Sequence, residues 1–240
     1  MGTVKDFTYI EYNKFIQILK DAGYIFTSFD NTEITEPFIL LRHDIDLDLK
    51  KAVIMSNIEH EMGVRATYFI MLRNIFYNTF SKSGMESINK IIENGHNIGL
   101  HFDCSVYPKE FTIENYKMSC KKELQTFEDW FNIHINVISY HRPNNFIFDN
   151  NGNISGKYYN TNEHYFTTIS KYYSDSRGKW KYGYPLDGEQ FKQKKPLHIT
   201  IHPIWWNEKH TTPYNSLLKF IEEDDYNFKT SLSKNCEVWK

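Results

Sequence analysis

The sequence predicts an α/β fold with a parallel sheet, in which short apolar runs alternate with longer stretches of helical periodicity. Several of the apolar runs end in clusters of His, Asp and Arg, and catalytic side chains gather at that edge in barrels of parallel strands. The chain has 240 residues, which is enough for one sizeable α/β domain and too few for two. We therefore expect a single domain that spans residues 1–240.

The helical stretches share a pattern of apolar side chains three and four residues apart. The first two stop at Gly23 and Gly63, because glycine suits the residue that follows a helix. Helices are expected over residues 9–22, 49–62, 88–93 and 111–131.

The runs between these helices are rich in β-branched and aromatic residues and too short for buried helices. Strands are expected over residues 38–42, 64–70, 97–101, 137–140 and 197–201. The stretch 144–165 is rich in Asn, Gly and Tyr, and it is predicted to be a long loop of the kind found beside active sites.

Composition narrows the function classes. The formal net charge is −2 and no long basic block occurs, so nothing predicts a partner that is a nucleic acid or an anionic lipid surface. No stretch approaches the length of a membrane span, and the N-terminus lacks the apolar segment of a signal peptide. The three cysteines, Cys104, Cys120 and Cys236, are too widely spaced to predict a disulfide framework or a cysteine metal cluster. A cytoplasmic protein is expected, and no oligomeric state follows from the sequence.

The first polar strand end carries two carboxylates. Asp44 and Asp46 are two residues apart, a spacing that points both side chains to one side of a strand. Close carboxylates favour a cation, and a divalent metal bound to one of them leaves the other able to accept a proton from water. The alternative is that Asp46 caps the helix that starts at residue 49, a role that we assign to Asp48.

His101 and Asp103 repeat this spacing at the end of a later strand. An imidazole and a carboxylate together suit zinc or a similar divalent ion. Taken alone, His101 could equally be a histidine that is hydrogen-bonded within a polar strand end.

Two further strand ends supply candidates for orienting and proton-transfer roles. Arg142 could place its guanidinium over the carboxylate of Asp44 or fix a substrate oxygen, or it is a surface residue before a turn. His202 could protonate a leaving amine. Trp205 and Trp206 could form the wall of a sugar pocket, since flat aromatic faces pack on sugar rings, or they fill the core.

In order and spacing these motifs resemble those of the polysaccharide deacetylase, or NodB-homology, superfamily of carbohydrate esterases. Five segments carry the resemblance, in the order of the five family motifs: residues 42–46, 95–101, 141–143, 174–180 and 197–202. It covers about residues 38–206 and implies an incomplete (β/α) barrel of about seven strands. The residues within these motifs are similar to those of a branch of the superfamily found among enzymes of bacterial surface-glycan biosynthesis.

The resemblance also implies site residues. The expected catalytic residues are Asp44, His141, Arg142 and His202; the expected metal ligands are Asp46, His101 and Asp103; the expected substrate contacts are Asp175, Arg177, Trp180, Trp205 and Trp206. In the family a second metal-binding His follows the first by four residues, and here Ser105 stands in that place. The third ligand must therefore come from Asp103 or His141.

The activity that the resemblance implies is that of a metal-dependent hydrolase, with zinc as the first choice of metal. Its expected substrate is an N-acylated amino sugar, free or linked to a nucleotide or lipid, in surface polysaccharide (lipopolysaccharide) biosynthesis. Two alternatives remain open at this point: another hydrolysis or cyclisation at a C–N bond of a modified sugar, and a catalytically silent barrel that binds a glycan.

Overall fold

A computed structural model describes residues 6–108, 110–150 and 154–239. Its centre is one sheet of parallel strands in the order β6-β5-β4-β3-β2-β8-β7, with the short β1 paired to β2 outside this path. The strands are β1 (Ile25–Thr27), β2 (Phe38–Ile45), β3 (Thr67–Ile70), β4 (Asn97–Asp103), β5 (Val137–His141), β6 (Tyr159–Asn160), β7 (Lys171–Ser174) and β8 (Leu197–Ile201). The sheet curls, and its ends β6 and β7 are not paired in the described residues. The prediction of an incomplete (β/α) barrel is therefore confirmed.

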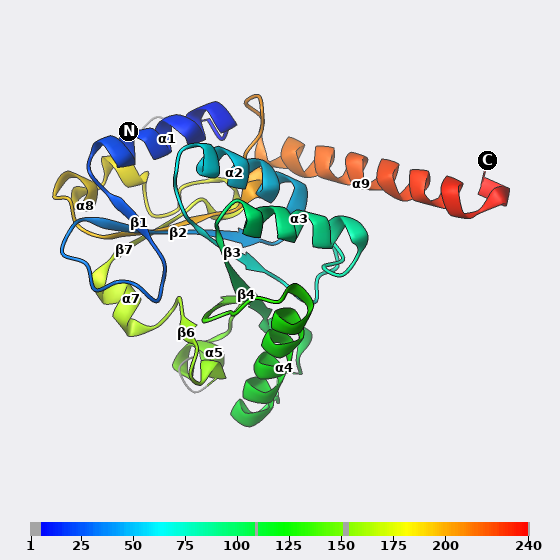
Figure 1. The fold of residues 1–240 in the computed structure, drawn as a ribbon, viewed down its shortest axis with the longest axis horizontal. Helices are drawn as coiled ribbons and strands as arrows, with labels where there is room; N and C mark the ends of the chain where they lie inside the picture. The colour runs from blue at the N-terminus through cyan, green and yellow to red at the C-terminus, as the bar shows by residue number, and fades with distance from the viewer. Residues whose placement is uncertain (1–5, 109, 151–153, 240) are drawn as a thin grey trace.

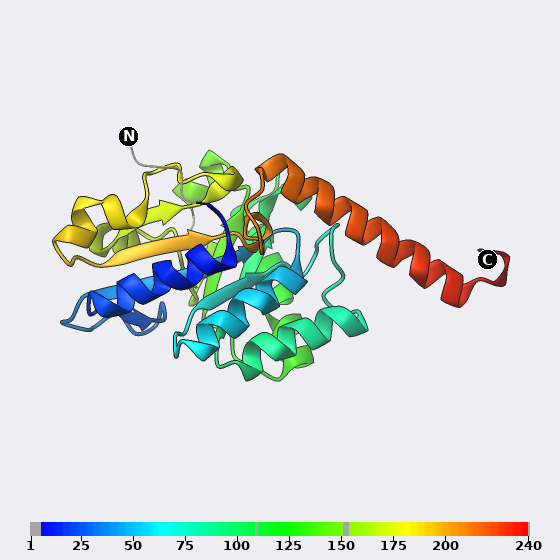
Figure 2. The same cartoon turned by 90° about the horizontal axis from the view of Figure 1, so that it is seen from above.

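Helices wrap the outside of this sheet, and one helix leaves the body altogether (Figures 1 and 2). The helices are α1 (Tyr9–Asp21), α2 (Leu49–Glu61), α3 (Lys82–Glu93), α4 (Ile113–Phe131), α5 (Asn145–Asp149), α7 (His164–Ile169), α8 (Glu189–Lys192) and α9 (Pro213–Asn235). Short 3₁₀ turns cover Cys104–Val106, Ser176–Gly178, Pro185–Asp187, Pro203–Trp205 and Glu237–Trp239. Within the described ranges, no helix has the length and hydropathy that a bilayer crossing requires.

Local chemistry explains where the first helices begin and end. Asp48 caps α2 as predicted, because its Oδ1 accepts the backbone N–H groups of Lys50 at 2.8 Å and Lys51 at 3.1 Å. Gly23 and Gly63 follow α1 and α2 with φ of +83° and +66°, a conformation that costs glycine little.

The structure corrects some predicted boundaries. The strand predicted from residue 64 begins at Thr67, and the helix predicted from residue 88 already begins at Lys82. The predicted loop at 144–165 contains α5, β6 and the start of α7, while its residues 151–153 lie outside the described part of the chain.

The two faces of the curled sheet bury different cores. The outer face packs against the helices, and side chains such as Ile39 and Leu41 of β2 belong to this large cluster. The inner face encloses a small apolar cluster made of Phe29, Phe38, Leu40, Phe69, Val137 and Phe166. Because side chains alternate along a strand, Arg42 and Asp44 share the inner face with Leu40.

His43 points the other way, into a buried polar network on the outer face. Its Nε2 lies 2.6 Å from Oε1 of Glu59, which also accepts hydrogen bonds from the hydroxyls of Tyr12 and of Tyr68, the latter at 2.7 Å. Burial would raise the pKa of Glu59, but the charge and hydrogen bond of His43 outweigh it and lower that pKa. The network joins α1, β2, α2 and β3, so it fixes the strand that carries the inner-face residues.

We expect Glu59→Gln to lower the free energy of unfolding by about 3 kcal/mol, because the substitution breaks a buried, hydrogen-bonded charge pair. Urea unfolding followed by circular dichroism measures the change. Glu61→Gln, at an exposed position of the same helix, is the matched control and should change stability by less than about 0.5 kcal/mol. Equal effects of the two substitutions would contradict a stabilising role for the network.

Candidate active site

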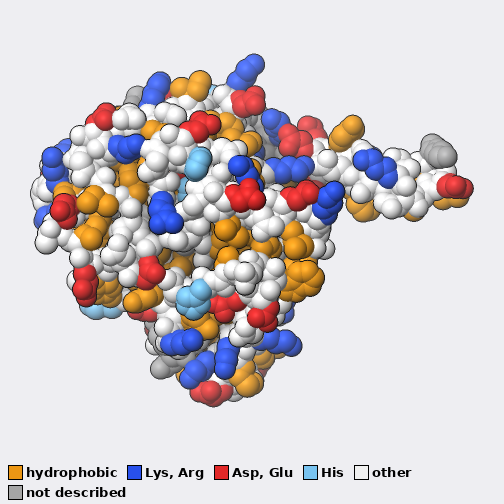
Figure 3. Space-filling model, viewed as in Figure 1, with side chains coloured by type: hydrophobic (Ala, Val, Ile, Leu, Met, Phe, Trp, Pro, Cys, Tyr) orange, Lys and Arg blue, Asp and Glu red, His pale blue; other side chains and the backbone are white. Residues whose placement is uncertain are grey.

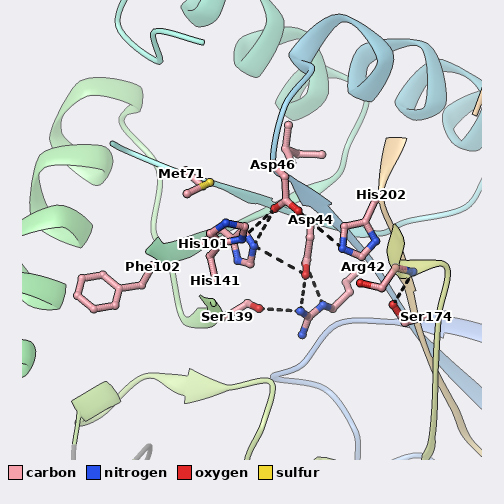
Figure 4. Close-up of polar contacts among 12 residues, drawn as sticks. Arg42, Asp44, Asp46, Met71, His101, Phe102, Ser139, His141, Ser174 and His202 are labelled. Carbon is pink, nitrogen blue, oxygen red and sulfur yellow. Dashed lines mark hydrogen bonds and ion pairs between the residues drawn. The ribbon is translucent and has the colours of Figure 1, made fainter. Parts of the chain in front are cut away.

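Polar side chains from four strands meet at the carboxyl edge of the sheet (Figure 4). They come from the ends of β2, β4, β5 and β8, which are neighbours or near neighbours in the sheet. The residues that meet there are Asp44, Asp46, His101, His141 and His202. Five residues predicted from four motifs therefore form one cluster.

Asp44 is held by a guanidinium two residues earlier on the same strand. Nε of Arg42 donates to Oδ1 of Asp44 at 3.0 Å, and a terminal nitrogen donates to Oδ2 at 2.6 Å. The same nitrogen donates to Oγ of Ser139 at 2.7 Å, and the guanidinium carbon lies 5.1 Å from the centre of the Phe69 ring. Such a two-bond pair fixes both the position and the orientation of the carboxylate.

The charge state of Asp44 follows from these neighbours. Burial would raise its pKa, but the charge of Arg42, followed by those of His101 and His202, holds it below its usual range. Asp44 is therefore ionised at neutral pH and oriented by Arg42.

In this structure Arg42, and not the expected Arg142, is the arginine that pairs with Asp44. Arg142 is exposed beyond β5 and has a φ of +50°, while Arg42 occupies the place beside the carboxylate. The signal was present in the sequence, because Arg42 and Asp44 have the same two-residue spacing that was used for Asp44 and Asp46. A contact of Arg142 with a substrate oxygen stays a prediction.

Asp46 lies between two imidazoles. Its Oδ1 is 3.2 Å from Nε2 of His101 and 3.2 Å from Nδ1 of His141, and one ligand atom from each of the three residues lies within 4.8 Å of the others. Burial would raise the pKa of Asp46, but the hydrogen bonds of His101 and His141 lower it well below its usual range. An ionised carboxylate with two imidazoles is a donor set that suits zinc and leaves further coordination positions for water and substrate.

Of the two candidates for the third ligand, His141 lies in this group and Asp103 does not. Oδ1 of Asp103 accepts hydrogen bonds from the backbone N–H of Ser105 at 2.8 Å and from its hydroxyl at 2.7 Å. Asp103 thereby caps the 3₁₀ turn that follows β4. The geometry therefore favours His141 as the third ligand, and the expected ligand role of Asp103 stays a prediction.

His202 approaches Asp46 from the side opposite to His101 and His141 (Figure 4). Its Nε2 lies 3.9 Å from Oδ2 of Asp46, and its Nδ1 lies 2.6 Å from Oδ1 of Asp175. Burial would lower the pKa of His202, but the hydrogen bond and charge of Asp175, with smaller contributions from Asp46 and Asp44, raise it to about 9. The imidazolium is therefore the main form at neutral pH.

Asp175 was predicted to contact substrate, and the structure corrects that role. The residue is 0% exposed, and besides His202 it accepts a hydrogen bond from Nε1 of Trp206 at 2.9 Å. It therefore acts on His202 and on the core.

Two of the tryptophans that were predicted to contact substrate pack into the core. Trp206 is 3% exposed and packs edge-on against Phe7 and Tyr12, with ring centres 5.1 and 5.0 Å apart. Trp180 is partly buried against Phe15, 6.1 Å away. Both indoles thus support the core beneath α1. The substrate contacts predicted for Trp205, which is partly buried, and for the exposed Arg177 stay predictions.

Comparison with known proteins places the fold. No family model and no curated protein matches the sequence. Among solved structures, the fold is similar to the deacetylase PplD from Streptococcus pyogenes in complex with acetate, with a TM-score of 0.50 and 14% identity over 86% of this chain and 84% of that chain.

Two further solved structures are similar at lower scores. One is a family 4 carbohydrate esterase from Bacillus anthracis, with a TM-score of 0.46 and 11% identity over 95% of this chain and 89% of that chain. The other is the chitin deacetylase from the fungal pathogen Colletotrichum lindemuthianum, with a TM-score of 0.44 and 13% identity over 85% of this chain and 87% of that chain. The likeness to PplD, at 14% identity, concerns the fold alone, and it agrees with the predicted incomplete (β/α) barrel.

Replacing Asp175 should move the titration of His202. A histidine with a raised pKa is protonated at neutral pH and loses its proton only as the pH rises through about 9. Asp175→Asn removes the charge that raises this pKa, so the midpoint should fall by at least about one pH unit. Histidine-selective NMR of the metal-free protein measures the midpoint, with the His202 signal assigned through His202→Gln.

The control for this measurement is Asp187→Asn, an exposed position that should leave the midpoint unchanged. A midpoint that stays near 9 in Asp175→Asn would show that Asp175 does not set the charge of His202.

Proposed function

We propose that this chain is a metal-dependent hydrolase of the polysaccharide-deacetylase type, which removes an N-acyl group from an amino sugar. The observation that carries the proposal is the arrangement around Asp46. An ionised, oriented carboxylate lies beside a possible metal site, and a protonated imidazole lies on its far side. Hydrolysis of an amide requires both a base for water and an acid for the leaving nitrogen.

The residues that would hold the metal are Asp46, His101 and His141. When bound there, zinc supplies a Lewis acid that polarises the amide carbonyl and makes water more acidic. The side chains of Asp46 and His141 are 21% and 14% exposed, so the group can be reached from solvent, whereas His101 is almost fully covered.

Asp44 is proposed as the base that takes a proton from the attacking water. Arg42 binds it through two hydrogen bonds, which fixes its direction while its remaining lone pairs stay free to accept. The low pKa of Asp44 makes it a weak base, so the proton transfer depends on a water whose acidity is raised at the same site.

His202 is proposed as the acid that protonates the departing nitrogen. Asp175 holds its Nδ1 and keeps the ring charged, so Nε2 presents a proton to the site. Because His202 lies across Asp46 from the two other histidines, the nitrogen can leave on the side opposite to the metal ligands.

The same geometry bears on the alternative of a silent binding barrel. The missing second histidine of the family motif was the reason to consider it, and His141 of the neighbouring strand supplies a second imidazole beside Asp46. A binding protein also has no use for a buried aspartate that keeps an imidazole charged. We further propose, from the family resemblance, a substrate linked to a nucleotide or lipid in surface polysaccharide biosynthesis. The cytoplasmic location stays an expectation.

Metal binding distinguishes the two candidates for the third ligand. The purified protein should bind about one zinc ion per chain, and His141→Ala should weaken zinc binding by at least about a hundredfold, because it removes a direct ligand. Asp103→Ala is the matched control and should leave the affinity within about threefold of that of the unaltered protein. Isothermal titration with zinc measures both, and the reverse result would return the third ligand to Asp103.

Acid and base variants test the chemistry. Asp44→Asn keeps the shape but removes the base, and His202→Ala removes the acid, so each should lower turnover by about a hundredfold or more. Release of acetate from a panel of N-acetylated amino sugars, free and nucleotide-linked, measures the rate. Both variants should still bind zinc, which shows that they fold, and His134→Ala, at an exposed position, should keep full activity. Full activity in both site variants would refute the assigned roles.

A further inference from the structure

A buried lysine of α2 contacts the segment that follows His202. Nζ of Lys51 donates a hydrogen bond to the backbone carbonyl of Ile204 at 2.9 Å and another to Oδ1 of Asn207 at 2.8 Å. Lys51 is 9% exposed, so these two oxygens take the place of water at its ammonium group. Helix α2 begins three residues after Asp46. The contact therefore joins the segment beyond Asp46 to the segment beyond His202.

Asn207 links this contact to two other helices. Its Nδ2 donates to the carbonyl of Trp205 at 2.8 Å and to Oγ of Ser216, in the first turn of α9, at 2.9 Å. Its backbone N–H donates to the carbonyl of Phe7 at 3.0 Å, and its carbonyl accepts from the N–H of Tyr9, the first residue of α1, at 2.9 Å. From here α9 projects beyond the body of the protein (Figures 1, 2 and 3). This part of the chain is thus fixed by contacts with α1, α2 and α9.

The 3₁₀ turn Pro203–Trp205 connects these contacts to the imidazole of His202. The N–H of Trp205 donates to the carbonyl of His202 at 3.1 Å and closes the turn. An oxygen of Asp175 accepts a hydrogen bond from the backbone N–H of His202 at 2.9 Å and lies 2.6 Å from its Nδ1. His202 is therefore fixed in two ways: Asp175 orients the ring, and Lys51 binds the turn that follows it.

The charge of Lys51 suits a positional role better than a stabilising one. Burial lowers its pKa to about 8, although the charge of Asp48 partly offsets that effect, so the ammonium form prevails at neutral pH. A buried charge often contributes little to stability, and apolar residues of similar size commonly replace buried charged groups without loss. The ammonium can, however, donate to two oxygens at once, which fixes the place of both relative to α2.

We propose that Lys51 is a positioning residue for the acid step, which keeps His202 at the distance from Asp46 that proton transfer requires. The role rests on the proposed hydrolase function, in which Nε2 of His202 gives its proton to the leaving nitrogen as the C–N bond breaks. Nε2 of His202 lies 3.9 Å from Oδ2 of Asp46, and Lys51 bridges the two segments that follow these residues. A displaced turn would leave the proposed metal ligands in place but move the acid away from the nitrogen.

Two substrates that differ in their need for an acid test this role. An amino sugar leaves only after its nitrogen gains a proton, whereas 4-nitrophenolate leaves 4-nitrophenyl acetate without one. Lys51→Met should therefore lower kcat by about tenfold or more for the N-acetylated amino sugar that the unaltered protein hydrolyses fastest, and by less than about threefold for 4-nitrophenyl acetate. Lys50→Met, the same exchange at the exposed neighbouring position, should leave both rates unchanged.

The ratio of the two rates separates positioning from stability, because it does not depend on how much of the sample is folded. His202→Ala, which removes the acid itself, gives the change in ratio that complete loss of the acid produces. Equal losses on both substrates in Lys51→Met would overturn the positioning role. If Lys51→Met yields no folded protein, Lys51→Gln, whose polar end is one bond shorter, should change the ratio in the same direction, and an unchanged ratio would overturn the role.

A structural comparison needs no activity. Crystal structures of the unaltered protein and of Lys51→Met should show Nε2 of His202 displaced by about 1 Å or more, a shift large enough to impair proton transfer. If the unaltered protein releases no acetate from any N-acetylated amino sugar, the hydrolase proposal fails, and this comparison decides whether Lys51 positions the imidazole. An imidazole that keeps its place in the variant would overturn the role of Lys51.

Discussion

All eight residues of β2 are buried. A polar residue on either face of this strand therefore needs a hydrogen-bonding partner within the protein. Because side chains alternate, His43 points outward and forms a hydrogen bond with Glu59. Arg42 and Asp44 point inward and form hydrogen bonds with each other. A shift of one residue in the register would place Arg42 and Asp44 in the apolar outer core and His43 in the barrel. The buried partners of these polar residues therefore fix the register of β2. That register in turn sets the positions of the side chains at the carboxyl edge of the strand.

The proposed chemistry at the carboxyl end of β2 depends on two buried groups of opposite charge, the carboxylate of Asp44 and the imidazolium of His202. A neighbouring residue stabilises the charged form of each. Arg42 keeps Asp44 ionised although the carboxylate is buried, and Asp175 keeps His202 protonated although the imidazole is buried. Burial opposes the charged form in both cases, and a single well-placed partner outweighs it. No hydrogen bond or ion pair joins Asp44 directly to His202 among the described residues, so the proposed base and acid do not neutralise each other.

Much of this arrangement could be predicted from the sequence, because periodicity is a local property. The alternation of apolar runs and helical stretches predicted the parallel sheet, and the polar strand ends predicted that Asp44, Asp46, His101, His141 and His202 would meet. The differences concern contacts that the pattern of strand ends does not specify. Asp103 accepts a hydrogen bond from Ser105 in the turn after β4. Asp175 and Trp206 are buried because α1, which is distant in the sequence, packs over them. The Arg42–Asp44 pair could have been predicted from the rule that residues i and i+2 of a strand share a face. The family resemblance implied Arg142 in that role instead.

The pairing of Arg42 with Asp44 means that the proposed base and the group that orients it lie two residues apart on one strand. The other contacts that the described chain gives this pair, with Ser139, Phe69 and His101, also come from strands. The segment after β5 makes no contact with the Arg42–Asp44 pair among the described residues, and it holds the exposed side chains of Arg142, Phe146 and Phe148. Insertions or exchanges in that segment can alter which molecules the protein accepts while the proton-transfer geometry stays constant, so selectivity and reactivity are able to diverge separately in this architecture.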